Sequence, residues 1–299
     1  MTTTVPPRGV FCAALTPVHE DLTPNHKAFA AHCQKLLRDG LTGIALLGTT
    51  GEANSFSTTE RQALLETALE TGVAPDKLIP GTGVTAFTET VALTRHALSV
   101  GVNTVVMLPP FYYKNVSDDG LFAAYAEVVE RVGDTKLAVI LYHIPQFSAV
   151  PISLAVIERL RTRYPGTFVG IKDSAGDLNH MIELVERCPG LSVLAGADPL
   201  MLPLLQKGGA GAITATSNLV GADLSFIFKN FDDASKGSDV QAAQERVIAA
   251  RNNASRFAQM ASLKALVAAQ TGDPGWHNMR PPLVPLTETE RSQLLANPQ

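Results

Sequence analysis

Residues 136–171 read KLAVILYHIPQFSAVPISLAVIERLRTRYPGTFVGI, and they contain the clearest structural pattern of the chain. Its first part, 136–142, and its last part, 168–171, are apolar at successive positions, which is typical of parallel strands covered on both faces. Between them, 151–163 has the spacing of an amphipathic helix. A strand, a helix and a second strand in this order predict a parallel βαβ unit.

The same alternation continues in both directions. Helical segments separate the apolar runs, and two of these segments are expected to begin at Thr23-Pro24 and at the capping box Ser57–Glu60. Eight strands alternating with helices predict an α/β fold, a (β/α)8 TIM barrel. A doubly wound sheet is the alternative, but no Gly-x-Gly-x-x-Gly follows the first strand. The other six apolar runs are 10–15, 43–47, 77–81, 104–108, 192–195 and 211–214.

The strands stop after about Phe231. Residues 239–270 are rich in alanine and favour a helix, and 287–296 favour a last short helix. We therefore expect a TIM barrel catalytic domain at 1–233 and a C-terminal helical domain at 234–299.

Composition excludes several classes of protein. The chain has 299 residues, a net charge of -4 and no run of basic residues, which argues against nucleic-acid binding. No apolar run is long enough to span a membrane, and the N-terminus has no signal pattern, so we expect a cytoplasmic protein. The three cysteines form no Cys-x-x-Cys pair and the histidines no His-Glu-x-x-His motif; we predict no metal and no cofactor.

Lys172 directly follows the apolar run 168–171. A lone lysine at a strand end commonly extends its ammonium to solvent, and it could pair with Asp173. The other interpretation is chemical, because burial disfavours the charged form of an amine and a neutral amine can attack a ketone to form a Schiff base. At the carboxyl end of a barrel strand, on the active face, the position suits carbonyl chemistry.

Gly48-Thr49-Thr50-Gly51-Glu52 follows the second predicted strand. It can be an ordinary strand-to-helix turn. It can also bind a small carboxylate, since two glycines let backbone N–H groups converge and two hydroxyls add donors. Glu52 is expected to order the loop rather than to contact an anion.

Tyrosines also follow predicted strands. Tyr142 ends the fifth strand, and its hydroxyl could be a satisfied core group or a proton relay. Tyr112 and Tyr113 lie after the fourth strand, where they could form an aromatic loop, a subunit contact or part of the site.

The ordered set of these motifs resembles the dihydrodipicolinate synthase/N-acetylneuraminate lyase family over nearly the whole chain. The resemblance implies a TIM barrel, a homotetramer built as a dimer of dimers, and class I aldolase chemistry on pyruvate or another 2-oxo acid. It rests on Gly48-Thr-Thr-Gly-Glu52, Pro110-Phe-Tyr-Tyr113, Tyr142-His-Ile-Pro145 and Gly170-Ile-Lys-Asp173.

The resemblance also implies roles for single residues. Lys172 would form the Schiff base and Tyr142 would move protons. Thr49 would link the hydroxyls in a relay to Tyr112, which in this family commonly comes from the neighbouring subunit. Thr50 and the backbone at Gly51 would hold the pyruvate carboxylate, and the Ile213 carbonyl would face the site.

Two departures bear on the substrate. Phe147 stands where the synthases carry an arginine for the second carboxylate of the aldehyde, and phenylalanine cannot make that contact. Asp198 matches a substrate-binding aspartate of the sialic acid lyases, but Pro199 and Ala215 replace its polar companions. These residues favour a lyase acting on another 2-oxo acid, such as a 2-keto-3-deoxy sugar acid or 4-hydroxy-2-oxoglutarate. The alternatives are the synthase proper, a non-catalytic barrel that binds a 2-oxo acid, and a metal-dependent aldolase.

Overall fold

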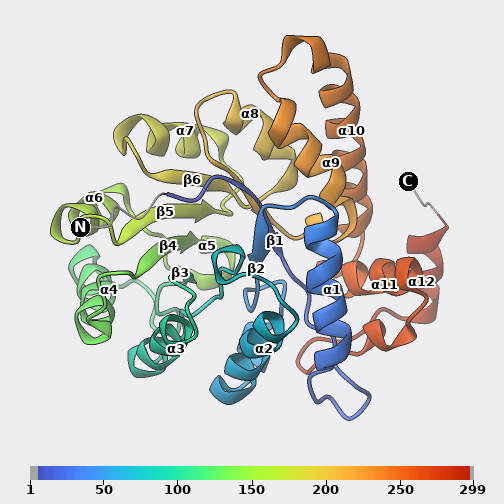
Figure 1. The fold of residues 1–299 in the computed structure, drawn as a ribbon, viewed down its shortest axis with the longest axis horizontal. Helices are drawn as coiled ribbons and strands as arrows, with labels where there is room; N and C mark the ends of the chain where they lie inside the picture. Colours follow the sequence, from blue (N-terminus) through green and yellow to red (C-terminus); the bar gives the residue numbers. More distant parts are fainter. Residues whose placement is uncertain (1–5, 297–299) are drawn as a thin grey trace.

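The computed structural model describes residues 6–296, in which seven parallel strands form a curved sheet surrounded by helices (Figure 1). The strands pair in the order β2-β1-β7-β6-β5-β4-β3, so β2 and β3 are the two ends of the sheet. The strands are β1 Gly9–Ala13, β2 Gly43–Ala45, β3 Thr104–Met107, β4 Ala138–His143, β5 Phe168–Asp173, β6 Ser192–Ala195 and β7 Gly211–Thr214.

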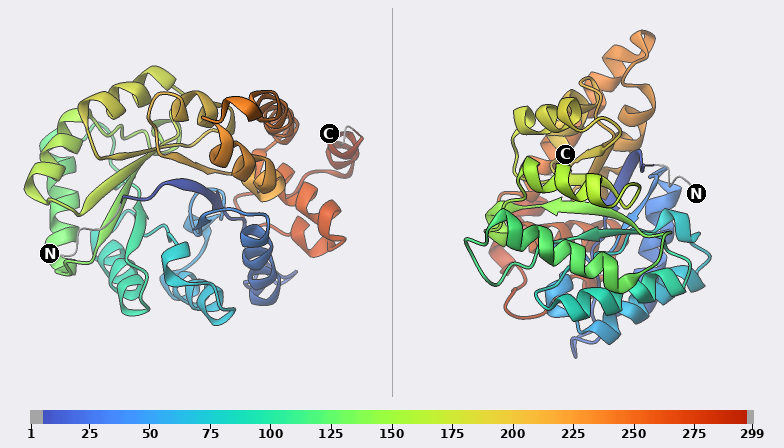
Figure 2. Two further views of the ribbon diagram at one scale, coloured as in Figure 1. Left: turned by 45° about the horizontal axis from the view of Figure 1, so that its top comes forward. Right: turned by 90° about the vertical axis from the view of Figure 1, so that its left-hand side faces the viewer.

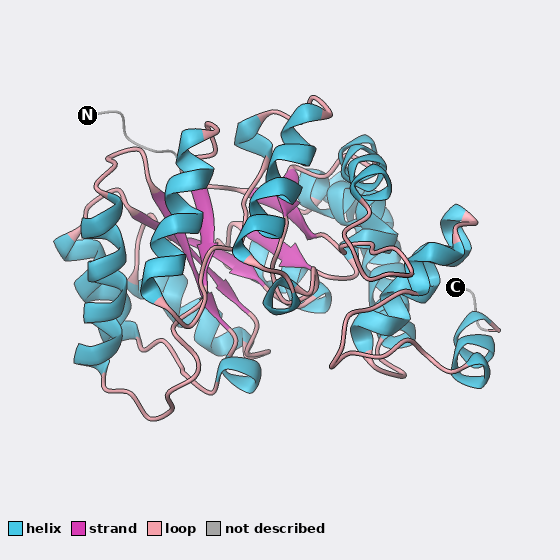
Figure 3. Cartoon of the chain, turned by 90° about the horizontal axis from the view of Figure 1, so that it is seen from below, coloured by secondary structure: helices cyan, strands magenta, loops and turns pink. Residues whose placement is uncertain are grey.

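Helices follow the strands and cover the outside of the sheet, as Figure 3 shows. None of those within residues 6–296 has the length and apolarity needed to cross a membrane. The helices are α1 His26–Arg38, α2 Thr58–Glu70, α3 Phe87–Ser99, α4 Asp118–Val132, α5 Pro145–Ser148, α6 Leu154–Arg163, α7 Leu178–Arg187, α8 Met201–Leu205, α9 Ser217–Asn230, α10 Gly237–Ala254, α11 Gln259–Thr271 and α12 Glu288–Leu295. Short 3-10 turns are η1 Ala53–Ser55, η2 Pro75–Lys77, η3 Asp198–Leu200, η4 Ala234–Lys236 and η5 Pro274–His277.

The strand predicted at 77–81 does not form as a regular strand. The segment nevertheless lies between β2 and β3: Ile79 and Gly81 donate backbone hydrogen bonds of 2.9 Å towards the β2 side, and Val106 of β3 donates one of 2.9 Å to the Pro80 carbonyl. Proline has no N–H, so the segment lacks one bond of the parallel ladder. The eighth position of the barrel is thus filled, and the predicted TIM-barrel fold is confirmed.

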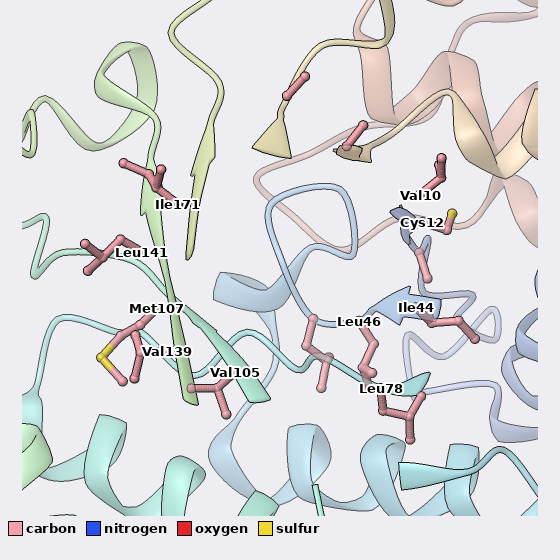
Figure 4. Close-up of a cluster of buried hydrophobic side chains, with 14 of the residues drawn as sticks. Val10, Cys12, Ile44, Leu46, Leu78, Val105, Met107, Val139, Leu141 and Ile171 are labelled. Carbon is pink, nitrogen blue, oxygen red and sulfur yellow. The ribbon is translucent and has the colours of Figure 1, made fainter. Parts of the chain in front are cut away.

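Side chains of the strands form two separate apolar layers. Those pointing outward pack against the helices, and Figure 4 draws fourteen of them around the wall, including Val10, Ile44 and Leu141. Those pointing inward, among them Phe11 and Ile140, fill the lumen. Each large aliphatic side chain that is fully buried contributes about 1.5–3 kcal/mol, and both layers together explain why the strands are apolar at successive positions.

Two predicted helix starts have different outcomes. The capping box is present: the Ser57 hydroxyl accepts from the Glu60 N–H at 3.3 Å, and the Glu60 carboxylate accepts from the Ser57 N–H at 2.9 Å. The start at Thr23-Pro24 is wrong, because α1 begins at His26 and its N-cap is Asn25. The Thr23 hydroxyl is already used, since it donates to Asp21 at 2.6 Å in the preceding turn.

The C-terminal part is helical, as expected. The predicted helical stretch 239–270 is divided into α10 and α11, and α12 forms within 287–296. Helix α10 packs along α9, and α11 and α12 extend to one side of the barrel (Figures 1 and 2). The domain boundary at 233/234 stays a prediction, and residues 1–5 and 297–299 of those ranges lie outside the described part of the chain.

Candidate active site

A β-bulge turns Lys172 into the lumen. Residue Val139 of β4 pairs with Phe168 of β5, but the next residue, Ile140, pairs with Gly170, so Val169 is an extra residue in β5. Because side chains alternate along a strand, one extra residue reverses the faces of all residues after it. Residues 170 and 172 consequently share the inward face of their β4 partners.

Lys172 and Tyr142 are cross-strand partners at the carboxyl ends of β5 and β4. Both are buried, with 6% and 3% of their surfaces exposed. The Nζ atom of Lys172 lies over the tyrosine ring, 4.2 Å from its centroid. The Tyr142 hydroxyl is 3.3 Å from Oγ1 of Thr49, within hydrogen-bonding distance. The structure therefore brings together three of the predicted catalytic residues in one chain.

The Gly48–Glu52 loop is tightly held. The Thr16 hydroxyl donates to the Gly51 carbonyl at 2.9 Å, and a Cβ atom on Gly51 would lie 2.8 Å from the carbonyl oxygen of Ala14. Thr50 is buried, with 8% of its surface exposed. Glu52 was expected to order the loop rather than to contact an anion. Its buried carboxylate indeed contacts the ammonium group of Lys264 on α11. No sequence pattern near Glu52 pointed to Lys264 as its partner.

Ile213 and Phe147 lie in different surroundings. Ile213, on β7, is fully buried in the inward-facing layer that also contains Tyr142. Phe147, on α5, is 64% exposed and lines a cavity of about 110 Å³ together with Thr49. The remaining residues around that cavity are Asn54, Leu108, Phe111, Ile144 and Ser148. The residues around the cavity are largely apolar and include no cation, although the Lys114 ammonium donates to the carbonyls of Phe111 and Ser148, which belong to this lining.

Tyr112 is not brought to the site within the chain. It is 72% exposed, and its ring packs edge-on against Tyr113 with the ring centroids 5.3 Å apart. Among residues 6–296, the side chain that reaches Thr49 is Tyr142.

Asp198 lies on the helix side of the barrel wall. It is fully buried at the start of η3, and its carboxylate is 3.7 Å from the guanidinium group of Arg251 on α10. Burial raises the pKa of the Asp198 carboxyl, while the neighbouring hydroxyls of Thr214 and Thr216 and the charge of Arg251 oppose that rise. Thr214 follows inward-facing Ile213 and so points outward. These contacts join η3 to α10 and do not bring Asp198 to Lys172.

A histidine–aspartate cluster behind the site escaped sequence analysis. His143, Asp173 and His180 have potential ligand atoms within 4.8 Å of one another, and Nδ1 of His180 lies 2.6 Å from Oδ2 of Asp173. That bond is the main cause of the raised pKa of His180. His143 is buried, which lowers its pKa. The histidines of this chain are six residues or more apart in sequence and form no metal-binding motif. No local signal therefore revealed the cluster.

The hydrogen bonds of this cluster do not favour a metal ion. Nδ1 of His143 accepts the N–H of Ile152 at 3.1 Å, which leaves the proton of the neutral ring on Nε2. That ring could not offer Nε2 to a metal without losing the bond to Ile152. The geometry instead shows two separate hydrogen bonds, one that ties His143 to Ile152 and one that ties Asp173, at the end of β5, to His180.

Comparison with known proteins identifies close sequence relatives. The profile described as the dihydrodipicolinate synthetase family matches residues 6–297. A protein of Chloroflexus aurantiacus named as an uncharacterized DapA-like lyase is 36% identical over 291 residues, which cover 97% of this chain and 95% of that protein. The 4-hydroxy-tetrahydrodipicolinate synthase of Listeria monocytogenes is 33% identical over 237 residues, 79% of this chain and 78% of that enzyme.

Solved structures have the same architecture. The dihydrodipicolinate synthase from Agrobacterium tumefaciens is 30% identical with a TM-score of 0.85, covering 96% of this chain and 97% of that one. A variant of the 2-keto-3-deoxygluconate aldolase of Sulfolobus solfataricus, 22% identical over 96% of this chain and 94% of that one, shares the fold with a TM-score of 0.85. The resemblance read from the ordered motifs is confirmed. The chain is a lyase that belongs to the dihydrodipicolinate synthetase family.

Proposed function

We propose that this lyase forms a Schiff base between Lys172 and the keto group of pyruvate or a longer 2-oxo acid, as a class I aldolase. The observation that carries the proposal is the position of Lys172. Its amine ends a buried strand, faces the lumen and lies 4.2 Å from the ring centroid of Tyr142. An amine with little access to water and a phenol beside it is suited to attack a carbonyl.

The proposed reaction is cleavage of a 4-hydroxy-2-oxo acid or its reverse. The amine adds to the keto carbon and water leaves, which produces a protonated imine. A base then takes the proton of the C4 hydroxyl, the C3–C4 bond breaks, and its electron pair moves towards the imine nitrogen to give an enamine. The aldehyde departs, C3 takes up a proton, and water releases pyruvate and the free amine. A dehydratase would use the same imine to make the neighbouring carbon acidic.

Tyr142 is the residue proposed to move protons. Its hydroxyl is 3.3 Å from that of Thr49, so a proton can pass between the two groups. Tyr112, exposed in this chain, would complete the relay from a neighbouring subunit in a homotetramer built as a dimer of dimers.

The Gly48–Glu52 loop is proposed to bind the carboxylate next to the keto group. Thr50 and the backbone around Gly51 supply donors, and the close packing of Gly51 against Ala14 keeps that backbone in place. Ile213, in the inward-facing layer, would present its carbonyl to the same space.

The opposite end of the substrate is proposed to carry no second carboxylate near Phe147. Phe147 and Thr49 line one cavity, and an aromatic ring there offers contact area but no charge. A 2-keto-3-deoxy sugar acid, or an aldehyde acceptor that is partly apolar, fits this wall better than aspartate semialdehyde does. We also propose that the protein is cytoplasmic, because central metabolic chemistry of this kind takes place there.

Borohydride reduction tests the covalent step. Wild-type protein incubated with pyruvate and borohydride is expected to gain the mass of a reduced pyruvyl group on Lys172, located by peptide mass spectrometry. Lys172→Ala should gain none and lose cleavage activity. Lys77→Ala is a matched control, because Lys77 is a partly exposed lysine that ends η2, the segment before Leu78 on the β2 side of the barrel. Full activity in Lys172→Ala would reject the proposal.

A panel of 2-oxo acids and aldehydes tests the substrate class. We expect pyruvate release from one or more keto-deoxy acids and weak turnover of aspartate semialdehyde. Efficient condensation of pyruvate with aspartate semialdehyde, and no cleavage of any keto-deoxy acid, would instead assign the synthase reaction. Imine formation without turnover of any panel member would indicate a binding protein.

A further inference from the structure

A buried ion pair connects the Gly48–Glu52 loop to the C-terminal helices. Lys264 on α11 is fully buried, and its ammonium contacts the carboxylate of Glu52, which is 3% exposed. The same Nζ donates to the carbonyl of Asn278 at 2.8 Å. Two residues separated by more than two hundred positions thus meet behind the loop that carries Thr49 and Thr50.

Stability alone is a weak explanation for this pair. Removing two charges from water is costly, and their mutual attraction often does no more than offset that cost. Apolar residues of similar volume can fill such a place equally well. A buried ion pair does, however, specify one geometry, because each partner must meet the other to avoid an uncompensated charge.

The loop held by Glu52 needs an external restraint. Glu52 has φ of 56° and Leu47, just before the loop, has φ of 58°. Both are left-handed conformations in residues with a side chain, which persist only where the surroundings impose them. The Glu52 N–H donates to the Thr49 carbonyl at 3.1 Å, so the backbone of Glu52 and the position of Thr49 are directly linked.

Lys264 is the cation that contacts the Glu52 side chain. The nearby Arg280 directs its guanidinium group to Glu60 and to the carbonyls of Leu22 and Ser55. The backbone N–H of Arg280, and not its guanidinium group, donates to Oε2 of Glu52 at 3.4 Å. The ammonium of Lys264 therefore has no equivalent substitute in the described residues around Glu52.

We infer that Lys264 is a positioning residue: through Glu52, it holds the Gly48–Glu52 loop so that Thr50 and the loop backbone bind the substrate carboxylate and Thr49 reaches Tyr142. The inference rests on the proposed function, because it assigns the C-terminal helix α11 a part in binding the 2-oxo acid. Lys264 acts on the loop and does not itself contact the substrate. Its loss should therefore weaken binding of pyruvate more than it slows the chemical step.

The test compares pyruvate saturation in four proteins. These are the wild type, Glu52→Gln, the double variant Glu52→Gln with Lys264→Met, and Asn253→Ala. The double variant leaves no unpaired charge, and Glu52→Gln, which keeps a hydrogen-bond acceptor of the same size opposite Lys264, is the second variant should the double variant fold poorly. Asn253 is a buried residue of α10 that donates to Leu294 at 3.4 Å, so its replacement weakens the C-terminal helices without touching Glu52. Emission of Trp276, the single tryptophan, checks that η5 remains packed in each protein.

Borohydride trapping at increasing pyruvate concentration gives the half-saturation concentration for the adduct on Lys172. Both Glu52 variants are expected to raise it about tenfold or more, while the trapping rate at saturation stays within about threefold of wild type. Asn253→Ala should lower the melting temperature and leave half-saturation unchanged. Half-saturation unchanged in both Glu52 variants would overturn the inference and leave a purely stabilising pair. Failure of the wild type itself to trap pyruvate would instead reject the proposed function, and the inference with it.

Discussion

Tyr142 and Lys172 face each other across β4 and β5 because Val169 is an extra residue in β5. Without the bulge, residue 172 would have the opposite orientation and its amine would point to the helices. The same register directs Asp173 outward, where it meets His180. One irregularity in one strand thus separates the inward face, which carries Lys172, from the pair of Asp173 and His180 behind it.

Replacing Tyr142 by phenylalanine should remove the proton relay and keep the ring beside Lys172. We expect kcat for cleavage to fall by about 10²–10⁴-fold, the usual contribution of a general acid–base group. Steady-state assays of pyruvate release measure the change. Tyr164→Phe is the control. The hydroxyl of Tyr164 donates to Glu130 at 2.6 Å. Equal rates for Tyr142→Phe and the control would show that the phenol carries no proton.

Gly51→Ala should destabilise the protein. The added Cβ would lie 2.8 Å from the backbone oxygen of Ala14, which cannot move without moving the end of β1. We expect a loss of about 1–3 kcal/mol in the free energy of unfolding, measured by urea denaturation. Gly48→Ala, where nothing lies within 4 Å of the new Cβ, should change it by less than about 0.5 kcal/mol. Similar losses in the two variants would contradict the packing argument.

Phe147→Arg should shift specificity towards aldehydes that carry a carboxylate. The guanidinium group can bind a carboxylate with two hydrogen bonds, and the exposed position limits the expected gain to about tenfold in kcat/KM. The ratio of kcat/KM for aspartate semialdehyde to that for a neutral aldehyde is the quantity to measure. Phe147→Leu keeps the site uncharged and should leave the ratio unchanged. The same shift in both variants would mean that size, not charge, governs the acceptor end.

His32 should make the protein sensitive to acid. Burial lowers the pKa of His32 from 6.5 to about 4, and its Nε2 lies 2.8 Å from Oδ1 of Asn218. The folded state therefore keeps the ring neutral while the unfolded state takes up a proton below pH 6.5. At about 1.36 kcal/mol per pKa unit, roughly 3 kcal/mol of unfolding free energy is lost between pH 6.5 and pH 4.

Unfolding measured across that pH range tests the effect of His32. His32→Gln should be less stable than wild type at pH 7 but should show a flatter fall on acidification, because its side chain does not titrate. His19→Gln, at an exposed position, should retain the wild-type slope. An unchanged slope in His32→Gln would show that other groups cause the acid sensitivity.

Local patterns predicted most of the fold. Continuous apolar runs identified β4 and β5, and the pair Ser57 and Glu60 identified the start of α2, because these signals depend on neighbours in sequence. The order of Thr49, Tyr142 and Lys172 along the chain was enough to predict one site at the carboxyl ends of the strands.

Other features depend on distant contacts that no local pattern records. The bulge at Val169 depends on the pairing of β5 with β4. The outward direction of Asp198 depends on Arg251, fifty-three positions later. The wrong helix start at Thr23 has a local cause: its hydroxyl donates to Asp21, two positions before it. For the bulge and for Asp198, the deciding partner comes into contact only in the assembled fold.

Pro80 gives the barrel a seam. One backbone hydrogen bond is missing between residues 78–82 and β3, because Pro80 has no N–H. The two ends of the seven-stranded sheet meet at this place. We therefore expect the backbone hydrogen bonds of the barrel to open first at this seam. Hydrogen–deuterium exchange of the backbone amides tests this order of opening. Strands β4 and β5 are paired on both sides. Lys172 and Tyr142 consequently stand on strands that do not border the seam, and we expect their amides to exchange later than those of 78–82 and β3.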